Sequence, residues 1–313
     1  MKKIIIGIDI GGTNVKMGLF SASKVELIEK KEYKTPRFQQ QVSVINSLKE
    51  NIDKIVQTNG FDIEDLIGIG VAVPCAVKNG FILSCPNIGL DKIKMEDELK
   101  KFFPNASIKV ANDATMAAFG ENKSLDKPFK NVVFITLGTG VGGGIIIDGN
   151  ILEGSNGFGG EIGHIKVHNE DLEPCGCGAN GCIEQICGTK GILTYTKKLA
   201  TEMDTIIDIN NLNIKVIFDA AKAGDKLGNL VVERVAKYIG MGAAIIGTII
   251  DPEAFIIGGG ISKSGDFLLD KIVANYKKEA RFTMAGTPFL IAKTGNDAGI
   301  LGSAYYINML RQN

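Results

Sequence analysis

Potential metal ligands are concentrated in one short stretch of the chain, Glu161 to Glu184, which reads EIGHIKVHNEDLEPCGCGANGCIE. This stretch contains both histidines of the protein and three of its six cysteines, Cys175, Cys177 and Cys182. Imidazole nitrogens and thiolates are the usual ligands of tetrahedral zinc, and a site closed by four protein ligands is structural. The glycines between the cysteines permit the tight turns that such a loop needs. The residue types and their spacing therefore predict a structural Zn²⁺ site.

Two points about this predicted site stay open at the level of the residues. The fourth ligand is either His164 or Cys187, because both lie close to the three cysteines in the sequence. A cluster of buried cysteines without a metal is the alternative interpretation. Disulfide bonds are a weaker alternative, because no secretion signal marks the chain and the cysteines indicate a reducing, cytoplasmic compartment.

A second candidate site is the pair Asn112-Asp113, which directly follows the predicted strand Ser107–Ala111 and precedes the predicted helix Ala114–Glu121. Ligands of α/β proteins bind at the carboxyl ends of strands, where this pair lies. Asn and Asp are also the residues favoured as plain helix caps. Composition alone leaves both interpretations open.

The turn Gly11-Gly12-Thr13 could bind a phosphate. It lies between two predicted strands, Lys3–Asp9 and Asn14–Phe20. Backbone N–H groups and the threonine hydroxyl can donate to phosphate oxygens, and Asp9 could lie near the accompanying Mg²⁺. An ordinary glycine hairpin is the alternative.

The segment Gly138-Thr139-Gly140 repeats this arrangement between the predicted strands Asn131–Leu137 and Ile145–Ile147. Glycines at 138, 140 and 143 also match the G-x-G-x-x-G pattern of dinucleotide-binding folds, but that pattern requires a helix after the glycines. A β-branched strand follows instead, so the dinucleotide interpretation is disfavoured. Two such hairpins in one chain predict an internally duplicated, two-lobed α/β fold.

The rest of the chain supplies the elements around these turns. Gly258-Gly259-Gly260 follows the predicted strand Glu253–Ile257, and either a nucleotide turn or a simple strand-to-helix loop fits it. The segment Cys75–Leu90 is expected to be an irregular loop, in which Cys75 and Cys85 are small buried residues. Helices are predicted over Gln39–Thr58, Met95–Phe103, Gly191–Ala200, Ile214–Ala223, Leu227–Ile250, Phe267–Lys278 and Ala298–Leu310.

Composition excludes several classes of partner. The chain has 313 residues, of which 45% are hydrophobic, and its 35 basic residues equal its 35 acidic ones. A balanced charge gives no overall attraction to nucleic acid or to a membrane surface. The uncharged stretch from residue 132 to 147 is rich in glycine and too short to span a bilayer.

The motifs of the central stretch resemble the signature of the ROK group (repressors, open reading frames and sugar kinases). The signature pairs Glu-x-Gly-His with Cys-x-Cys-Gly-x-x-Gly-Cys-x-Glu, and the chain has these at Glu161–His164 and Cys175–Glu184. The resemblance extends over nearly the whole chain. It implies the two-lobed fold of the actin, Hsp70 and hexokinase superfamily (ribonuclease H-like), with a cleft between the lobes.

The resemblance also implies roles for individual residues, with Asp113 as the catalytic base. The implied zinc ligands are His164, Cys175, Cys177 and Cys182, which leaves Cys187 outside. The implied sugar-binding residues are Asn87, Asn112, Asp113, Glu161, His164 and Glu184. The implied contacts to ATP and Mg²⁺ are Asp9, Gly11, Gly12, Thr13, Gly138, Thr139, Gly140, Gly258, Gly259 and Gly260. Relatives that resemble glucokinase usually have Gly where this chain has Cys75.

The activity implied by the resemblance is ATP-dependent phosphorylation of a hexose, most simply glucose, at its 6-hydroxyl. N-acetylmannosamine, allose, fructose or a β-glucoside are alternative substrates, and a sugar sensor without catalysis is an alternative of another class. The first predicted strand leaves no room for a preceding helix-turn-helix, which favours a kinase over a repressor. The resemblance also implies a homodimer. Within each chain, one lobe is expected to contain residues 1–118 and 298–313, and the other, with the zinc motif, residues 119–297.

Overall fold

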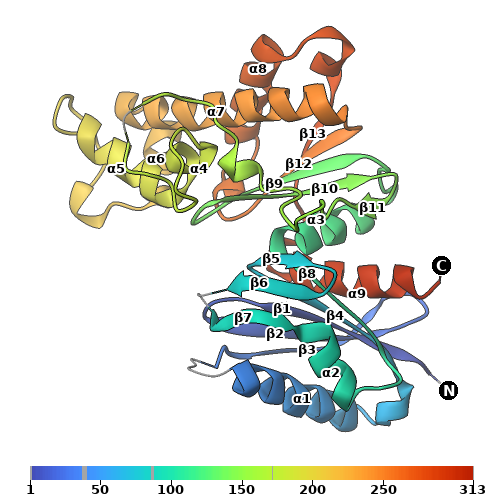
Figure 1. Ribbon diagram of the computed structural model, residues 1–313. Coiled ribbons are helices and arrows are strands. Elements are labelled where there is room, and N and C mark those ends of the chain that lie inside the picture. Colours follow the sequence, from blue (N-terminus) through green and yellow to red (C-terminus); the bar gives the residue numbers. More distant parts are fainter. Residues whose placement is uncertain (1, 37–40, 86–87, 171, 313) are drawn as a thin grey trace. The chain divides into compact units, whose positions relative to one another are not determined.

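The computed structural model describes residues 2–36, 41–85, 88–170 and 172–312 (Figure 1). The described chain forms two compact units. Unit 1 comprises residues 1–128, 151–160 and 296–313, and unit 2 comprises residues 129–150 and 161–295.

Unit 1 is built on a five-stranded sheet with the order β3-β2-β1-β4-β8. Its strands are β1 (Ile4–Ile10), β2 (Asn14–Ser21), β3 (Leu27–Lys34), β4 (Leu66–Val73) and β8 (Ser107–Asn112). A small second sheet contains β5 (Ala76–Lys78), β6 (Phe81–Cys85) and β7 (Leu90–Lys94). The helices are α1 (Gln41–Thr58), α2 (Met95–Phe102), α3 (Asp113–Lys123) and α9 (Ala298–Leu310).

Alternating side chains of β1 give unit 1 a core on each face of its large sheet. Ile4, Ile6 and Ile8 belong to the core that includes residues of α1 and α2. Ile5 belongs to the other core, which includes residues of α9. Strands buried on both faces are nearly continuous in apolar residues, which explains the isoleucine-rich start of the chain.

Unit 2 is built on a five-stranded sheet with the order β11-β10-β9-β12-β13. Its strands are β9 (Val132–Leu137), β10 (Val141–Ile147), β11 (Asn150–Ile151), β12 (Ala254–Gly258) and β13 (Phe289–Ile291). The helices are α4 (Ile183–Cys187), α5 (Thr189–Leu199), α6 (Ile214–Lys222), α7 (Lys226–Ile250) and α8 (Asp266–Glu279). No helix in the described ranges is long and apolar enough to cross a membrane.

The two large sheets repeat one topology, which confirms the predicted duplication. In unit 1, β1 pairs antiparallel with β2 and parallel with β4. In unit 2, β9 pairs antiparallel with β10 and parallel with β12. Each central hairpin therefore has its glycine turn at the same position in its sheet.

The division into units differs from the boundary that was expected after residue 118. Helix α3 lies wholly in unit 1, because its backbone packs directly on α9. A Cβ atom on Gly120 would lie 2.3 Å from the carbonyl oxygen of Ala298, and one on Gly302 would lie 1.7 Å from that of Met116. Residues 151–160 also belong to unit 1, although they lie within the range that was expected to form the other lobe.

The segment from Cys75 to Leu90 is not the irregular loop that was expected. It forms the β5–β6 hairpin, which is followed by β7 in the small sheet of unit 1. Asn79 and Gly80 form the turn, with φ of 49° and 72°. Asn-Gly between two strands is a strong hairpin signal, so the sequence contained this information.

Candidate active site

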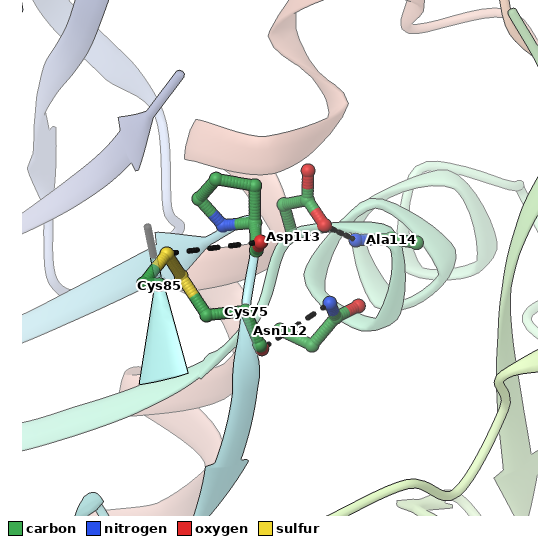
Figure 2. The surroundings of a disulfide bond; sticks show 6 residues. Cys75, Cys85, Asn112, Asp113 and Ala114 are labelled. Atoms are coloured by element: carbon green, nitrogen blue, oxygen red, sulfur yellow. Dashed lines mark hydrogen bonds between the residues drawn. A yellow bond between two sulfur atoms is a disulfide. The ribbon is translucent and has the colours of Figure 1, made fainter. Parts of the chain in front are cut away.

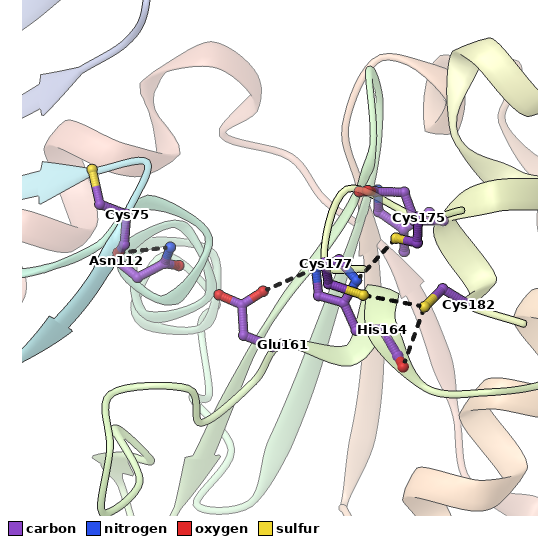
Figure 3. Close-up of polar contacts among 9 residues, drawn as sticks. Cys75, Asn112, Glu161, His164, Cys175, Cys177 and Cys182 are labelled. Atoms are coloured by element: carbon purple, nitrogen blue, oxygen red, sulfur yellow. Dashed lines mark hydrogen bonds and ion pairs between the residues drawn. The ribbon is translucent and has the colours of Figure 1, made fainter. Parts of the chain in front are cut away.

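The structure brings together the ligand atoms of His164, Cys175, Cys177 and Cys182. These four atoms all lie within 4.8 Å of one another (Figure 3). The Sγ atoms of Cys177 and Cys182 are 3.7 Å apart, and Nδ1 of His164 is 3.5 Å from Sγ of Cys175. A tetrahedral zinc with Zn–S bonds of about 2.3 Å needs ligand separations of roughly 3.8 Å. The cluster therefore fits a single tetrahedral Zn²⁺.

Local backbone conformation closes this loop around the cluster. The Cys175 N–H donates to the carbonyl of Ala179, and the Gly178 N–H donates to the carbonyl of Cys175. Gly178 and Gly181 have φ of 86° and 101°, values that residues other than glycine rarely adopt. The glycines of the motif thus allow three cysteines to converge within eight residues of chain.

The thiols of the cluster differ in their acidity. The backbone N–H of Ala179 beside Cys177 lowers the pKa of that exposed thiol. Burial raises the pKa of the Cys182 thiol to about 12, and the neighbouring Cys175 and Cys177 thiols add to this. Metal binding requires the thiolate form, so a cation at this cluster would release protons from its buried members.

The imidazole of His164 has two different neighbours. Its Nδ1 atom faces Cys175, and its Nε2 atom lies 3.9 Å from Oε2 of Glu161 (Figure 3). His164 is the last residue of the short 3₁₀ turn Ile162–His164, and Glu161 is the cap residue that precedes this turn. The side chain can therefore hold a metal through one nitrogen while the other remains next to a carboxylate.

Glu184 connects the metal cluster to the second glycine turn within unit 2. It lies in α4, directly after the cysteine motif, and its Oε2 atom accepts a hydrogen bond of 3.0 Å from the N–H of Val141. A Cβ atom on Gly140 would lie 2.0 Å from the same oxygen. A side chain at position 140 would thus displace the Glu184 carboxylate from this position.

A pocket of about 610 Å³ opens beside this contact, and all of its lining residues lie in unit 2. Thr139, Gly140 and Glu184 are among the residues that line it. Lys190 and Arg234 also line it, but Lys190 pairs with Glu173 and Arg234 pairs with Glu170. Two residues expected at the nucleotide and one expected at the sugar therefore share one cavity.

Asn112 and Asp113 lie where β8 ends and α3 begins. The Asn112 side chain caps the helix, because its Oδ1 atom accepts the N–H of Thr115 at 3.1 Å. The N–H of Ala114 donates to Oδ1 of Asp113 at 2.7 Å. Asn112 is therefore a helix cap, as one of the two interpretations predicted. Its amide nitrogen donates to the carbonyl oxygen of Cys75, 3.4 Å away.

The first glycine turn is held from one side by Thr35. The Thr35 hydroxyl donates to the carbonyl of Gly11 at 2.6 Å, and its N–H donates to that of Thr13 at 2.9 Å. A Cβ atom on Gly12 would meet nothing within 4 Å, so the turn has an open side. Burial raises the pKa of the neighbouring Asp9, with the positive charge of Lys16 acting in the opposite direction.

The third glycine turn has packing reasons for two of its glycines. Gly259 has φ of 86°, and a Cβ atom there would lie 2.2 Å from the carbonyl of Leu137. A Cβ atom on Gly258 would lie 2.6 Å from the ring of Phe134. Gly260 alone has open space around it. The simple loop interpretation accounts for Gly258 and Gly259 without a nucleotide.

The remaining histidine and cysteines have other partners. Nε2 of His168 lies 3.2 Å from the carbonyl oxygen of Cys182, so the ring supports the backbone of the cluster. Cys187 is fully buried, with its Sγ atom 3.7 Å from the carbonyl oxygen of Val235. Asn87, expected at the sugar, lies outside the described residues.

Cys75 and Cys85 are buried as expected, but they are not separate residues. They form a disulfide bond, with Cα atoms 5.3 Å apart. The register of the β5–β6 hairpin pairs Ala76 with Ser84, which places the two cysteines at the next opposed position. Cys75 lies four residues before Asn79 and Cys85 five residues after Gly80, and the register shift between Ala76 and Val77 brings them opposite each other. Two cysteines at nearly equal distances from an Asn-Gly turn were the signal that could have predicted the bond.

Comparison with known proteins places this geometry in a family. The sequence model of the ROK family matches residues 5–309. The chain belongs to the ROK family. Its architecture is accordingly the α/β fold of the actin and hexokinase superfamily, as the resemblance implied.

Relatives of this ROK protein include sugar kinases of near equal length. It is 37% identical to the glucokinase of Halalkalibacterium halodurans, over 96% of this chain and 94% of the relative. It is 28% identical to the N-acetylmannosamine kinase of Escherichia coli O1:K1, over 96% of each chain. The crystal structure of a ROK glucokinase from Streptomyces griseus with glucose and AMPPNP is similar with a TM-score of 0.77 and 28% identity, covering 99% of this chain and 100% of that one.

Proposed function

We propose that this ROK protein is an ATP-dependent hexose kinase that phosphorylates glucose at the 6-hydroxyl. The observation that carries the proposal is its similarity, over nearly the full length, to the glucokinase of H. halodurans. The glucose and AMPPNP bound by the S. griseus relative support the same pair of substrates. We include in the proposal that the protein is a cytoplasmic homodimer. A balanced net charge and small-molecule substrates are consistent with this.

The proposed catalytic base is Asp113. Its carboxylate accepts the proton of the 6-hydroxyl as that oxygen attacks the γ-phosphorus of ATP and the β–γ bridging bond breaks. Its position at the first turn of α3 supports this role, because the end of a strand followed by a helix is a common ligand site of α/β folds. Phosphoryl transfer depends mainly on positioning and charge stabilisation, so one base at the acceptor oxygen is sufficient.

The proposed sugar-binding groups are polar side chains. They are Asn87, Asn112, Asp113, Glu161, His164 and Glu184. Glu161 and the Nε2 atom of His164 face each other at 3.9 Å, which gives adjacent acceptor and donor positions for sugar hydroxyls. Glu184 is already oriented by the N–H of Val141.

We also propose that His164, Cys175, Cys177 and Cys182 hold a structural Zn²⁺, whose role is to fix the loop that bears Glu161, His164 and Glu184. The separations within the cluster support this assignment. For ATP and its Mg²⁺ we propose Asp9, Gly11, Gly12, Thr13, Gly138, Thr139, Gly140, Gly258, Gly259 and Gly260. The open sides of Gly12 and Gly260 support backbone contacts with phosphates or with the nucleoside.

The test is ADP release with ATP and Mg²⁺ across glucose, mannose, fructose, allose, glucosamine, N-acetylglucosamine and N-acetylmannosamine. We expect turnover with glucose above about 1 s⁻¹, the low end of typical enzymes. If N-acetylmannosamine is preferred, the proposed substrate changes from glucose to the sugar named for the E. coli relative. If a sugar binds without ADP release, the proposed function changes from a kinase to a sugar sensor.

A further inference from the structure

The disulfide between Cys75 and Cys85 lies next to a residue of the proposed sugar site (Figure 2). The carbonyl oxygen of Cys75 is the acceptor for the Nδ2 atom of Asn112, at 3.4 Å. Asn112 is also tied to strand β4, because its backbone pairs with Val73. The disulfide therefore closes the β5–β6 hairpin at the end where the hairpin meets the start of α3.

Both redox states of this cysteine pair can be accommodated. The hairpin register opposes the two residues whether or not they are bonded, since neighbouring strands place opposed Cα atoms about 5 Å apart. The Sγ atom of Cys85 lies 3.8 Å from the carbonyl oxygen of Pro74, which can accept a hydrogen bond from a Cys85 thiol. Reduction therefore leaves the buried Cys85 thiol with an acceptor.

The other cysteines do not take part in this bond. Three of them belong to the metal cluster, and Cys187 is a free, buried thiol in α4. Disulfides in a reducing compartment are usually transient or redox-sensing rather than structural. A disulfide beside a proposed sugar-binding residue is thus placed where its redox state can affect sugar binding.

We propose that Cys75 and Cys85 form a reversible thiol–disulfide site that regulates sugar affinity, an inference that rests on the proposed function. Oxidation proceeds by exchange with a low-molecular-weight disulfide. One protein thiolate attacks that disulfide and releases one small thiol, and the second protein thiolate then attacks the mixed disulfide and releases the other. Two protein thiols and one small disulfide become one protein disulfide and two small thiols.

The oxidised form is the one with higher sugar affinity. The bond fixes the Cys75 backbone, and with it the acceptor that orients the Asn112 amide. Two thiols cannot approach as closely as two bonded sulfurs, so reduction displaces the hairpin end and weakens this contact. Loss of one such hydrogen bond corresponds to a roughly 2- to 10-fold weaker affinity. The contact of Asp113 with the N–H of Ala114 is independent of the hairpin, so kcat should stay within about 2-fold.

The first test counts thiols by mass spectrometry after alkylation of the unfolded protein, following equilibration with oxidised glutathione or with dithiothreitol. We expect four alkylated cysteines in the oxidised protein and six in the reduced protein, with one cross-linked peptide containing Cys75 and Cys85. Cys175, Cys177 and Cys182 should alkylate in both states. Six alkylated cysteines after oxidation would overturn the proposal.

The second test measures glucose binding by calorimetry and the KM and kcat for glucose in both redox states. We expect a KM and a dissociation constant that rise roughly 2- to 10-fold on reduction. The variant Cys85→Ala should match the reduced protein and should not respond to either reagent. The variant Cys187→Ala, which removes a buried thiol outside the pair, should respond as the wild type does.

The outcomes separate this proposal from the proposed function. Equal affinity and equal KM in the two states, with active enzyme, would overturn the regulatory role and leave the kinase intact. A protein that forms the disulfide but neither binds nor phosphorylates any hexose would overturn the kinase and, with it, the regulation of sugar affinity. A response of Cys85→Ala to dithiothreitol would assign the effect to other cysteines and overturn the proposal.

Discussion

Three of the described side chains proposed to contact substrate also have a structural partner that fixes their position. Asn112 caps α3, Glu184 accepts the N–H of Val141, and Nδ1 of His164 faces Cys175. Positioned groups lose little freedom when substrate binds, which favours both affinity and rate. Substitutions at these residues will therefore change structure as well as chemistry, whereas Asp113 allows the chemistry to be isolated.

The variant Asp113→Asn should keep the fold and lower kcat by at least about 100-fold, the usual scale for loss of a general base. The amide oxygen can still accept the N–H of Ala114, so the start of α3 is preserved. Steady-state kinetics with glucose, alongside a thermal melt, checks both parts. A kcat close to that of the wild type would remove Asp113 from the role of base.

The variant Asp9→Asn should increase the free energy of unfolding at pH 7 while lowering turnover. Burial raises the pKa of Asp9 in the folded state, so the folded state is favoured when Asp9 is protonated and loses stability as the pH rises through that pKa. The neutral amide avoids this loss. The gain should shrink as the pH is lowered toward 3.8, the ordinary value.

Urea unfolding without nucleotide, at pH 7 and at pH 4.5, measures this effect. Asp270→Asn, at an exposed position, should change the free energy of unfolding by less than about 0.5 kcal/mol at either pH. A loss of stability in Asp9→Asn at pH 7 would show that the ionised carboxylate has a stabilising partner in the fold.

At the scale of elements, the metal cluster organises a stretch that has little apolar surface of its own. The variant Cys177→Ser should lose the bound zinc and lower both stability and sugar affinity, because binding of a structural metal is coupled to local folding. Elemental analysis, thermal melts and glucose titration measure the three consequences. One equivalent of zinc retained in the variant would refute the ligand assignment.

Helices α3 and α9 meet at glycines, and this contact holds Asp113 at the edge of the large sheet of unit 1. The variant Gly302→Ala should lower the free energy of unfolding by about 1–3 kcal/mol or more, because its Cβ atom would lie 1.7 Å from the carbonyl oxygen of Met116. Gly286→Ala, with nothing within 4 Å of the added atom, is the matched control. Equal stability of the two variants, by chemical unfolding, would show that the helices can separate without loss.

At the scale of the whole molecule, glucose is proposed to bind the folded chain and not the unfolded one, so it should stabilise the fold. At a concentration of about 100 times its dissociation constant, a ligand adds about 2.7 kcal/mol. We expect the Tm to rise by several degrees with glucose in the wild type and in Asp113→Asn alike, by differential scanning fluorimetry. An unchanged Tm with glucose, but a rise with another hexose of the panel, would reassign the substrate.

The sequence by itself determined the duplicated architecture and the three cysteines of the metal cluster, while the structure placed His164 beside them. The hairpins around Gly11–Thr13 and Gly138–Gly140 are local, since a strand, a turn and a strand follow one another in the chain. The cysteine motif is equally local, and its residues converge within one loop. Patterns of this kind are set by neighbouring residues, and the periodicity of apolar side chains predicts them.

Only the tertiary structure decided what depends on contacts between distant segments. Packing of Gly120 against α9 extended unit 1 beyond residue 118, and the approach of Glu184 to Gly140 joined the metal cluster to the second turn. The bond between Cys75 and Cys85 followed from the register of the β5–β6 hairpin, in a segment that was expected to be an irregular loop. Such contacts depend on how distant elements pack, and local patterns in the sequence do not reveal that packing.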